Sequence, residues 1–243
     1  MRKKNGDRAN VKKGLAVFFI LFLLLAVFSV FSMYRRYQRE RFAYEDHLED
    51  AVIQIDGEAV TLRRFGYYIY KVEDFVQQQA LLYDKNDPVQ YWNVHFSAGA
   101  DSVFMRDYAK EIAMETCIRD LIYAQRAREE GYALSAEEEQ QALERSRNVF
   151  DGMEPAQRDA TGLTWEDILY IERDKLIGER YADNYLASHD VTVYGDSASG
   201  ALSYDGAYYL QVIKPQHTVI LNEDLIRRLS VGTITVNMGR AEK

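Results

Sequence analysis

The sequence predicts a mainly α-helical protein with a small β part, an α+β fold, behind an N-terminal transmembrane helix. Three observations predict this class. Apolar residues recur at three- and four-residue steps through most of residues 62–188. Short runs of β-branched and aromatic residues stand on both sides of that region. Residues 14–33 form a run of 20 residues without a charged side chain.

The composition is typical of a chain that folds around a core. Hydrophobic residues make up 47% and charged residues 28% of the 243 positions, which excludes the disordered and low-complexity classes. The single cysteine, Cys117, excludes an internal disulfide and a thiolate-rich zinc site, and we expect it to be buried. The net charge of −8 argues against nucleic acid as the main partner, because phosphate binding depends on clustered Lys and Arg.

The uncharged run at 14–33 is a candidate membrane span, because a helix of this length rises about 30 Å, the thickness of the hydrocarbon layer. Residues 1–13 carry six basic residues and one acidic residue, so we expect them to stay in the cytoplasm. The sequence therefore predicts a single-pass protein of the bacterial cytoplasmic membrane with its bulk on the extracytoplasmic side. A cleaved signal peptide, with a weak cleavage site at Val30 to Ser32, is the alternative.

Three different patterns follow the apolar run: a charged segment, two short strand-like runs and a helix. Residues 34–50 are densely charged and lack Gly and Pro, which predicts a juxtamembrane stalk helix. Val52 to Ile55 and Val60 to Thr61 then read as two short strands joined by a tight turn at Asp56 and Gly57. Thr61 can cap a helix that ends in the turn at 84–88. Its predicted apolar face consists of Leu62, Phe65, Ile69, Val72, Val76 and Tyr83.

The longest helix is expected after an irregular loop at 89–100. Asp101 or Ser102 can cap it, and Gly131 stands where a glycine commonly follows the last helical turn. Its face includes Phe104, Tyr108, Ile112, Cys117, Leu121 and Ala124.

Two further helices have local start signals. Ser135 and Glu138 form a capping box that opens a helix running to about Phe150, and Thr164 caps a helix that ends near His189. Pro155 and Gly162 mark the break between these helices. From Val191 onward, runs of β-branched and aromatic residues predict short strands, and one short helix is expected at Asn222 to Leu229. The predicted strand-like runs are 191–194, 207–213, 217–221 and 232–236.

The residues that usually carry chemistry form no convincing site, so we predict no catalytic residue, metal or cofactor. Histidines 47, 95, 189 and 217 are scattered without metal-ligand spacing. No glycine-rich phosphate loop follows a strand, so nucleotide binding has no support. The stretch Gly195 to Gly200 resembles the Gly-Asp-Ser sequence around the nucleophile of chymotrypsin-like proteases. The residues before Ser197 are predicted to be helical, whereas the chymotrypsin fold consists of two β-barrels. We therefore interpret this stretch as a loop rather than as a catalytic site.

Aromatic residues are unusually dense between Phe65 and Tyr108. On the first long helix, aromatic side chains fall on more than one face, so this helix is either enclosed by its own protein or offers one face to a partner. Both interpretations stay open at this point. If a partner is bound, the candidate client-binding residues are Tyr67, Tyr68, Tyr70, Phe75, Tyr91, Trp92 and Phe96.

The order of these segments resembles the N-terminal chaperone module of the SurA and PrsA family. Three stretches carry the resemblance: 52–65 (VIQIDGEAVTLRRF), 109–143 and 162–186. It covers about residues 51–188. The resemblance implies an extracytoplasmic folding helper, and it implies that a strand after the helices returns to pair with Val52 to Ile55. Many members also carry a parvulin-type prolyl isomerase domain. The segment 190–243 lacks the Gly-Gly-x-Leu-Gly run and the paired histidines of that domain.

We therefore expect a helical module at 51–189 that is completed by a β-rich segment at 190–243. The expected function is that of a membrane-anchored, ATP-independent chaperone that binds unfolded exported polypeptides. The main alternative is an interaction or scaffold protein dedicated to one partner of a cell-envelope complex. A divergent prolyl isomerase is the lesser alternative.

Overall fold

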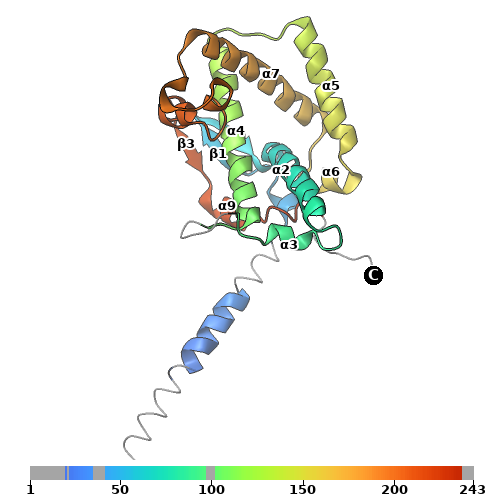
Figure 1. Cartoon of the computed structure of the whole chain (residues 1–243). Coiled ribbons are helices and arrows are strands. Elements are labelled where there is room, and N and C mark those ends of the chain that lie inside the picture. Colours follow the sequence, from blue (N-terminus) through green and yellow to red (C-terminus); the bar gives the residue numbers. More distant parts are fainter. Residues whose placement is uncertain (1–19, 21, 35–41, 97–101, 237–243) are drawn as a thin grey trace, which may run out of the picture. The chain divides into compact units, whose positions relative to one another are not determined.

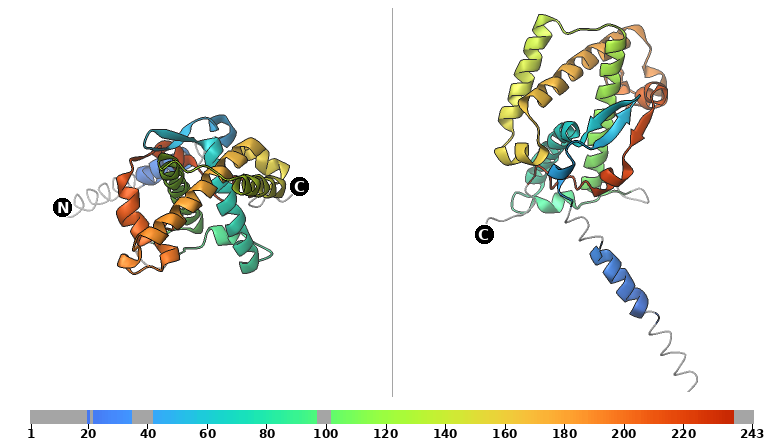
Figure 2. Two further views of the ribbon diagram at one scale, coloured as in Figure 1. Left: turned by 90° about the horizontal axis from the view of Figure 1, so that it is seen from above. Right: turned by 180° about the vertical axis from the view of Figure 1, so that it is seen from behind.

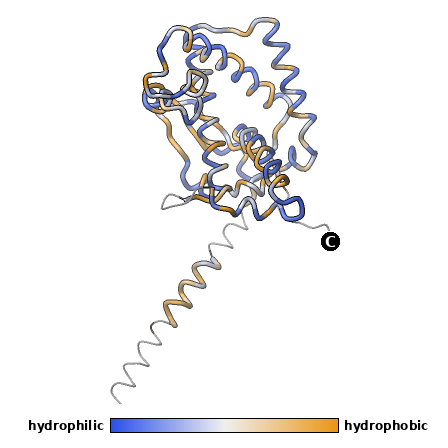
Figure 3. Tube along the Cα trace, viewed as in Figure 1, coloured by the Kyte–Doolittle hydropathy of each residue, from blue (hydrophilic) through white to orange (hydrophobic). Residues whose placement is uncertain are grey.

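The computed structural model describes residues 20, 22–34, 42–96 and 102–236. The chain divides into two compact units, residues 1–43 and 44–243, and each unit is described by itself. In the first unit, residues 22–34 are helical, with their side chains exposed. Figure 3 shows this helix as hydrophobic along most of its length.

Among the described residues, no helix combines the length and the apolar character that a membrane crossing needs. The predicted span at 14–33 includes residues 14–19 and 21, which lie outside the described residues, as does the predicted cytoplasmic tail at 1–13.

The predicted stalk helix at 34–50 is wrong for its second half. Tyr44 to His47 form a single 3₁₀ turn that belongs to the second unit, and Tyr44 is buried there. The Tyr44 hydroxyl donates a hydrogen bond to the backbone oxygen of Leu62 (2.6 Å). An aromatic ring in a charged stretch thus fixes the start of the folded unit. Residues 35–41 lie outside the described part of the chain.

The second unit is mainly helical with one small antiparallel sheet, as predicted (Figure 1). Its helices are α2 (Leu62–Tyr83), α3 (Val89–Trp92), α4 (Met105–Glu129), α5 (Ala136–Gly152), α6 (Pro155–Thr161), α7 (Trp165–Ser188), α8 (Ala198–Ala201) and α9 (Glu223–Arg228). Its strands are β1 (Ala51–Ile55), β2 (Glu58–Thr61) and β3 (Val219–Leu221).

The sheet has the order β2-β1-β3, so the strand from the end of the chain pairs with the first strand. Ile53 lies opposite Leu221, and Ile55 lies opposite Val219. The pairing of a C-terminal strand with 52–55 was expected from the family resemblance and is confirmed. The hairpin turn is also as predicted, since Asp56 (φ 49°) and Gly57 (φ 91°) both have the positive φ that a tight two-residue turn requires.

The helix starts follow local chemistry. Oγ1 of Thr61 accepts the backbone N–H of Arg64 (3.3 Å), and capping boxes open α5 and α7 at Ser135 and Thr164, as predicted. The predicted cap of α4 is wrong. Phe104 stands at that position, and Ser102 is hydrogen-bonded to His95 instead. Asp101 lies outside the described residues.

Two short helices interrupt regions that were expected to be irregular. The loop predicted at 89–100 contains α3, and the break between Pro155 and Gly162 contains α6, which begins with Pro155 in its first turn. Proline suits that position because the first helical N–H groups have no partner within the helix. Proline therefore starts a helix here rather than only ending one.

The segment 190–243 is not β-rich within its described part. Only the run at 217–221 contains a strand, β3. Residues 192–194 form a 3₁₀ turn, residues 209–213 form a π-helical turn, and 232–236 contains only turns and bends. Tyr209 explains one of these differences, because its ring is fully buried against Tyr123 of α4 (5.9 Å between ring centroids). The aromatic side chains of this segment pack on helices rather than on neighbouring strands.

Helix α7 crosses α4 and runs beside α5, while α2 packs on α4 (Figures 1 and 2). Helix α5 is largely hydrophilic (Figure 3), and it contacts α7 through a small cluster around Ala142, Leu169 and Leu176. The main core lies between α2, α4 and the sheet. Its fully or almost fully buried side chains include Val52, Ile55, Leu62, Ile69, Cys117 and Leu121.

A ring of four charges connects the hairpin with three helices. Arg64 of α2 bridges Glu58 of β2 (3.1 Å) and Asp174 of α7 (2.5 Å). Arg128 of α4 contacts the same two carboxylates, Asp174 at 2.9 Å and Glu58 at 3.3 Å. Burial raises the pKa of Asp174, which the attraction of the two arginines offsets only in part. We call these four residues the charge ring.

A second buried carboxylate holds the last described residues. Glu73 of α2 is fully buried and accepts backbone N–H groups from Gly232, Ile234 (3.3 Å) and Thr235 (2.5 Å). The Thr235 hydroxyl donates to it as well (2.5 Å). Burial raises the pKa of Glu73, while the hydrogen bonds from Thr235, Gly232 and Ile234 act in the opposite direction.

We expect Asp174→Ala to lower the free energy of unfolding by about 2–4 kcal/mol, because it leaves the largely buried Arg64 with only the partly exposed Glu58 as a partner. The matched control is Asp224→Ala, which breaks the exposed pair with Arg227 and should cost no more than about 1 kcal/mol. Urea denaturation of both variants measures the difference. Equal losses in the two variants would contradict the role of the charge ring.

Glu73 should also make stability depend on pH. Its folded pKa lies above the unfolded value of about 4.3, so its contribution is full below that value and is lost as the pH rises through the folded pKa. The unfolding free energy of the wild type, minus that of Glu73→Gln, should therefore fall as the pH rises above about 4. Denaturation at several pH values measures it, with Asp74→Asn as the exposed control on the same helix. A difference that rises with pH would show that folding lowers the pKa of Glu73 instead of raising it.

Candidate functional site

The seven candidate client-binding residues do not form one exposed surface. Tyr67 is 1% exposed, and Tyr68, Tyr70 and Trp92 are also buried. Phe75 (60% exposed) and Phe96 (50% exposed) face solvent, and Tyr91 is half-buried. Four of the seven, Tyr67, Tyr68, Tyr70 and Trp92, are therefore not surface residues. The other three remain candidates for contact with a partner.

The three tyrosines of α2 are buried because neighbours cover this helix on several sides. The Tyr67 hydroxyl donates to Glu172 of α7 (2.5 Å) and accepts from Lys175 (3.0 Å). Burial, with the charge of Glu172, raises the pKa of Tyr67, which keeps the hydroxyl protonated as a donor. Tyr70 lies next to Gly152 at the end of α5. Of the two interpretations of the aromatic faces, internal packing holds for Tyr67, Tyr68 and Tyr70.

Trp92 is enclosed by the end of the described chain. Its indole N–H donates to Gln77 of α2 (3.1 Å), and the backbone of Gly232 lies against the ring. A Cβ atom at Gly232 would come within 2.7 Å of the indole, and φ there is 93°, so only glycine fits. The contacts of Glu73 hold this same turn in place. Trp92 is therefore a core residue.

Exposed apolar side chains gather elsewhere, at one end of the second unit. The second half of α2, α3 and the start of α4 meet there (Figure 1). Leu82 is 82% exposed, and it follows Phe75 by seven residues, which places both on one strip of α2. We call this surface the apolar tip. It consists of Phe75, Leu81, Leu82, Tyr83, Phe96, Val103 and Phe104, each more than a third exposed.

Ring contacts hold three aromatic members of the apolar tip, Tyr83, Phe96 and Phe104, in place. Tyr83 packs against Tyr91 (5.4 Å between centroids), and Phe96 stacks on Tyr108 (3.9 Å). The Phe104 ring packs on the His95 ring (4.4 Å between centroids), and the backbones of these two residues form an isolated β-bridge. Aromatic rings that are already ordered lose little conformational freedom when they bind a partner. The apolar tip thus combines exposure with preorganisation.

Sequence reasoning missed Leu81 and Leu82, and it placed Tyr83 and Phe104 on buried helix faces. A signal for Leu82 exists, because Phe75 and Leu82 share a strip of α2 opposite the face that contains Leu62 and Ile69. No sequence signal shows that neighbours enclose Tyr67 while leaving Phe75 free.

The residues considered for catalysis have structural roles. Oγ of Ser197 accepts the backbone N–H of Gly200 at the start of α8 (3.2 Å). His217 is paired with Asp56 (2.5 Å), and His189 stacks on Tyr185. Burial raises the pKa of Cys117, which is fully buried as expected. In the part of the chain that the structure describes, no group of three or more His, Cys, Asp or Glu residues is placed to hold a metal ion.

Comparisons of the chain with family models, with curated proteins and with solved structures find no match.

The unfolding free energy of variants tests whether Trp92 is a core residue and Phe75 a surface residue. We expect Trp92→Ser to cost about 3–5 kcal/mol of unfolding free energy, since it removes a fully buried ring. Phe75→Ser should change it by no more than about 0.5 kcal/mol, because that ring faces solvent. Chemical denaturation followed by circular dichroism gives both values. A stable Trp92→Ser protein would contradict the burial described above.

Proposed function

We propose that this protein is a membrane-anchored, extracytoplasmic chaperone-like protein that binds unfolded exported polypeptides through the apolar tip and has no prolyl isomerase activity. The observation that carries the proposal is the apolar tip itself. Soluble surfaces rarely gather this many exposed apolar side chains unless they contact a partner.

Two features support an unfolded polypeptide as the partner. The apolar tip offers seven exposed side chains that are all aliphatic or aromatic, which suits the apolar segments that an unfolded polypeptide exposes. The three stretches that resemble the SurA and PrsA module, at 52–65, 109–143 and 162–186, point to the same activity. The uncharged run at 14–33 and the basic residues before it support the anchor and the orientation.

The surface charge fits the same role. Residues 14–243 carry the acidic excess of the chain, because the basic residues of 1–13 outnumber the acidic one there. An acidic surface keeps a complex with an aggregating polypeptide soluble, and it is repelled by an anionic membrane. The exposed apolar side chains would then be the attractive part of the surface.

The test measures light scattering by a heat-denatured reporter enzyme in the presence of the full-length protein in lipid nanodiscs, without nucleotide. We expect suppression of aggregation at near-equal molar ratios. The triple variant Phe75→Ser, Leu82→Ser and Phe96→Ser should lose at least about half of the suppression, because it removes three exposed apolar contacts.

The matched control replaces three exposed apolar residues outside the apolar tip, Val193→Ser, Leu210→Ser and Ile220→Thr, and should keep full suppression. Equal suppression by both triple variants would reject the apolar tip as the binding surface. No suppression by the folded wild type would reject the general chaperone. A pull-down that then returns one partner in equal amount would favour the dedicated envelope scaffold.

A further inference from the structure

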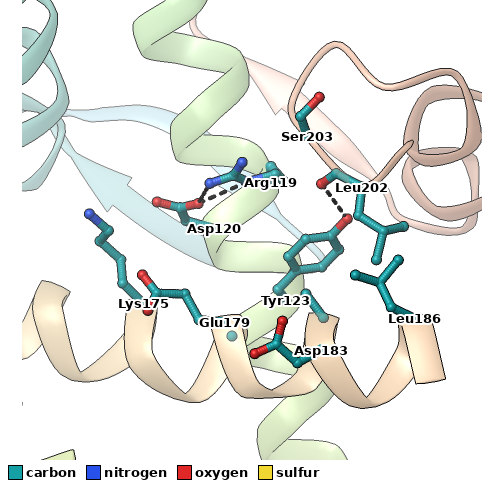
Figure 4. A pocket seen from close by; sticks show the side chains of 11 residues that line it. Arg119, Asp120, Tyr123, Lys175, Glu179, Asp183, Leu186, Leu202 and Ser203 are labelled. Carbon is teal, nitrogen blue, oxygen red and sulfur yellow. Dashed lines mark hydrogen bonds and ion pairs between the residues drawn. The ribbon is translucent and has the colours of Figure 1, made fainter. Parts of the chain in front are cut away.

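The outer edge of the small sheet is a part of the described surface where backbone groups lack partners. Strand β3 ends the strand order β2-β1-β3, and it lies at the periphery of the second unit in two opposite views (Figures 1 and 2). The cavity of about 280 Å³ between α4 and α7 differs in this respect, because its charged residues Arg119 and Asp120 are paired with each other (Figure 4).

Two hydrogen bonds at the ends of β3 fix which of its backbone groups face β1. The Asp56 N–H donates to the backbone oxygen of Thr218 (3.0 Å), and the Asn222 N–H donates to that of Val52 (3.0 Å). In an antiparallel pair, every second residue is bonded to the neighbouring strand. Ile220, midway between Thr218 and Asn222, is therefore also bonded to β1 through its backbone.

The N–H and C=O groups of Val219 and Leu221 consequently point away from β1. In the part of the chain that the structure describes, no residue donates to these outward groups or accepts from them. The side chains agree with this. Ile55 and Ile53, which lie opposite on β1, are 0% and 1% exposed, whereas Val219 and Leu221 are only half-buried. The outer side of β3 thus has the hydrogen-bonding capacity for one more strand.

The sequence of this edge lacks the features that usually prevent pairing. Exposed edge strands are commonly protected by a lysine, a proline or a bulge. Residues 218–222 (TVILN) contain no charged residue and no proline, and Ile220 in their middle is 56% exposed. The opposite edge of the sheet, β2, carries Glu58, which belongs to the charge ring. Of the two edges, β3 is therefore the one that suits pairing.

We propose that β3 pairs with β3 of a second copy of this chain, antiparallel and about a two-fold axis at Ile220. In this register Val219 lies opposite the partner's Leu221, and each outward N–H meets an outward C=O. Ile220 packs on the partner's Ile220, which covers both exposed side chains. The two small sheets then form one continuous sheet.

This register is the one that uses every outward group of β3. An axis at Val219 would place Leu221 opposite the partner's His217, whose N–H is already hydrogen-bonded within the chain. An axis at Leu221 would place Val219 opposite the partner's Glu223, where α9 begins. The axis at Ile220 pairs strand residues with strand residues and leaves no outward donor without an acceptor.

The charges beside β3 are complementary in the same arrangement, because the start of β3 lies next to the end of the partner's β3. Arg126 lies beside the start, where its guanidinium donates to Gln216 (2.8 Å) and to His217 (3.2 Å). Glu223 and Asp224 follow the end of β3 and are exposed. The two-fold axis therefore brings a cationic group toward two carboxylates at each end of the contact, which favours the antiparallel orientation.

The contact is small, since β3 has three residues, whereas an ordinary stable interface buries about 1,600 Å². The proposal therefore rests on the membrane anchor of the proposed function. Copies that are confined to one membrane meet at a high effective concentration, so a weak contact is enough to pair them. We expect the paired state in the membrane rather than in dilute solution.

Disulfide formation between two copies tests this register. The Cα atoms of facing residues in a non-hydrogen-bonded antiparallel pair lie about 4.5 Å apart, which suits a disulfide. We expect full-length Ile220→Cys, at low density in liposomes and treated with copper phenanthroline as a mild oxidant, to give a covalent dimer on a non-reducing gel. The native Cys117 is fully buried, so the wild type should not cross-link.

Thr218→Cys is the matched control, because Thr218 is exposed and lies two positions before Ile220 on the same face. In the proposed register the two introduced thiols lie about 13 Å apart, so they should cross-link at least about ten times more slowly. Val219→Pro, added to Ile220→Cys, removes an outward N–H that the chain itself does not use, and it should slow cross-linking at least about tenfold. Circular dichroism checks the fold of that variant, and the two cysteine variants test the register without it.

Four outcomes would overturn the proposal. Ile220→Cys does not cross-link in the anchored protein, or Thr218→Cys cross-links as fast. Ile220→Cys reacts with an added unfolded polypeptide that carries one cysteine in preference to a second copy, which would show that the edge binds clients. Extraction with alkaline carbonate releases the protein from the liposomes, which would reject the anchor on which the pairing rests. The aggregation assay tests client binding at the apolar tip separately.

Discussion

The charge ring of Glu58, Arg64, Arg128 and Asp174 is the constraint on which the rest of the second unit depends. It joins the hairpin to α2, α4 and α7, elements that are far apart in the sequence. Arg64 and Asp174 are largely buried, and leaving either charge without its partner is costly, so the ring favours one arrangement of these elements. The pair of Arg128 and Asp174 joins α4 directly to α7, so the ring also fixes how these two helices cross.

The structure separates two kinds of aromatic residue that the sequence presents together. Tyr67 and Trp92 each have a polar atom that is hydrogen-bonded inside the unit, to Glu172 and to Gln77. Phe75 and Phe96 have no polar atom and face solvent. A buried ring with a satisfied hydroxyl or indole contributes to the core, whereas exposed rings without one add an apolar surface that a partner can cover. This difference assigns the proposed binding role to the apolar tip.

Local chemistry made much of the fold predictable, and tertiary packing decided the remainder. The turn at Asp56 and Gly57 and the caps at Thr61, Ser135 and Thr164 depend on a few adjacent residues, so a sequence pattern can find them. The run at 207–213 has β-branched and aromatic residues but forms helical turns, because Tyr209 packs against Tyr123 of α4. Exposure was hardest to predict. A helical pattern orders the faces of α2, but it does not say how many neighbours will cover each face.

The pairing of β1 with β3 has a consequence for how the chain reaches its fold. Ile53 and Leu221 are partners although 168 positions separate them, so the central strand acquires its second neighbour only when nearly the whole chain has emerged. Until then one edge of β1 has free backbone donors and acceptors, which can pair with another chain. A nascent chain of this kind would need protection of that edge until Val219 to Leu221 reach it. Premature termination before Val219 would leave the edge open permanently.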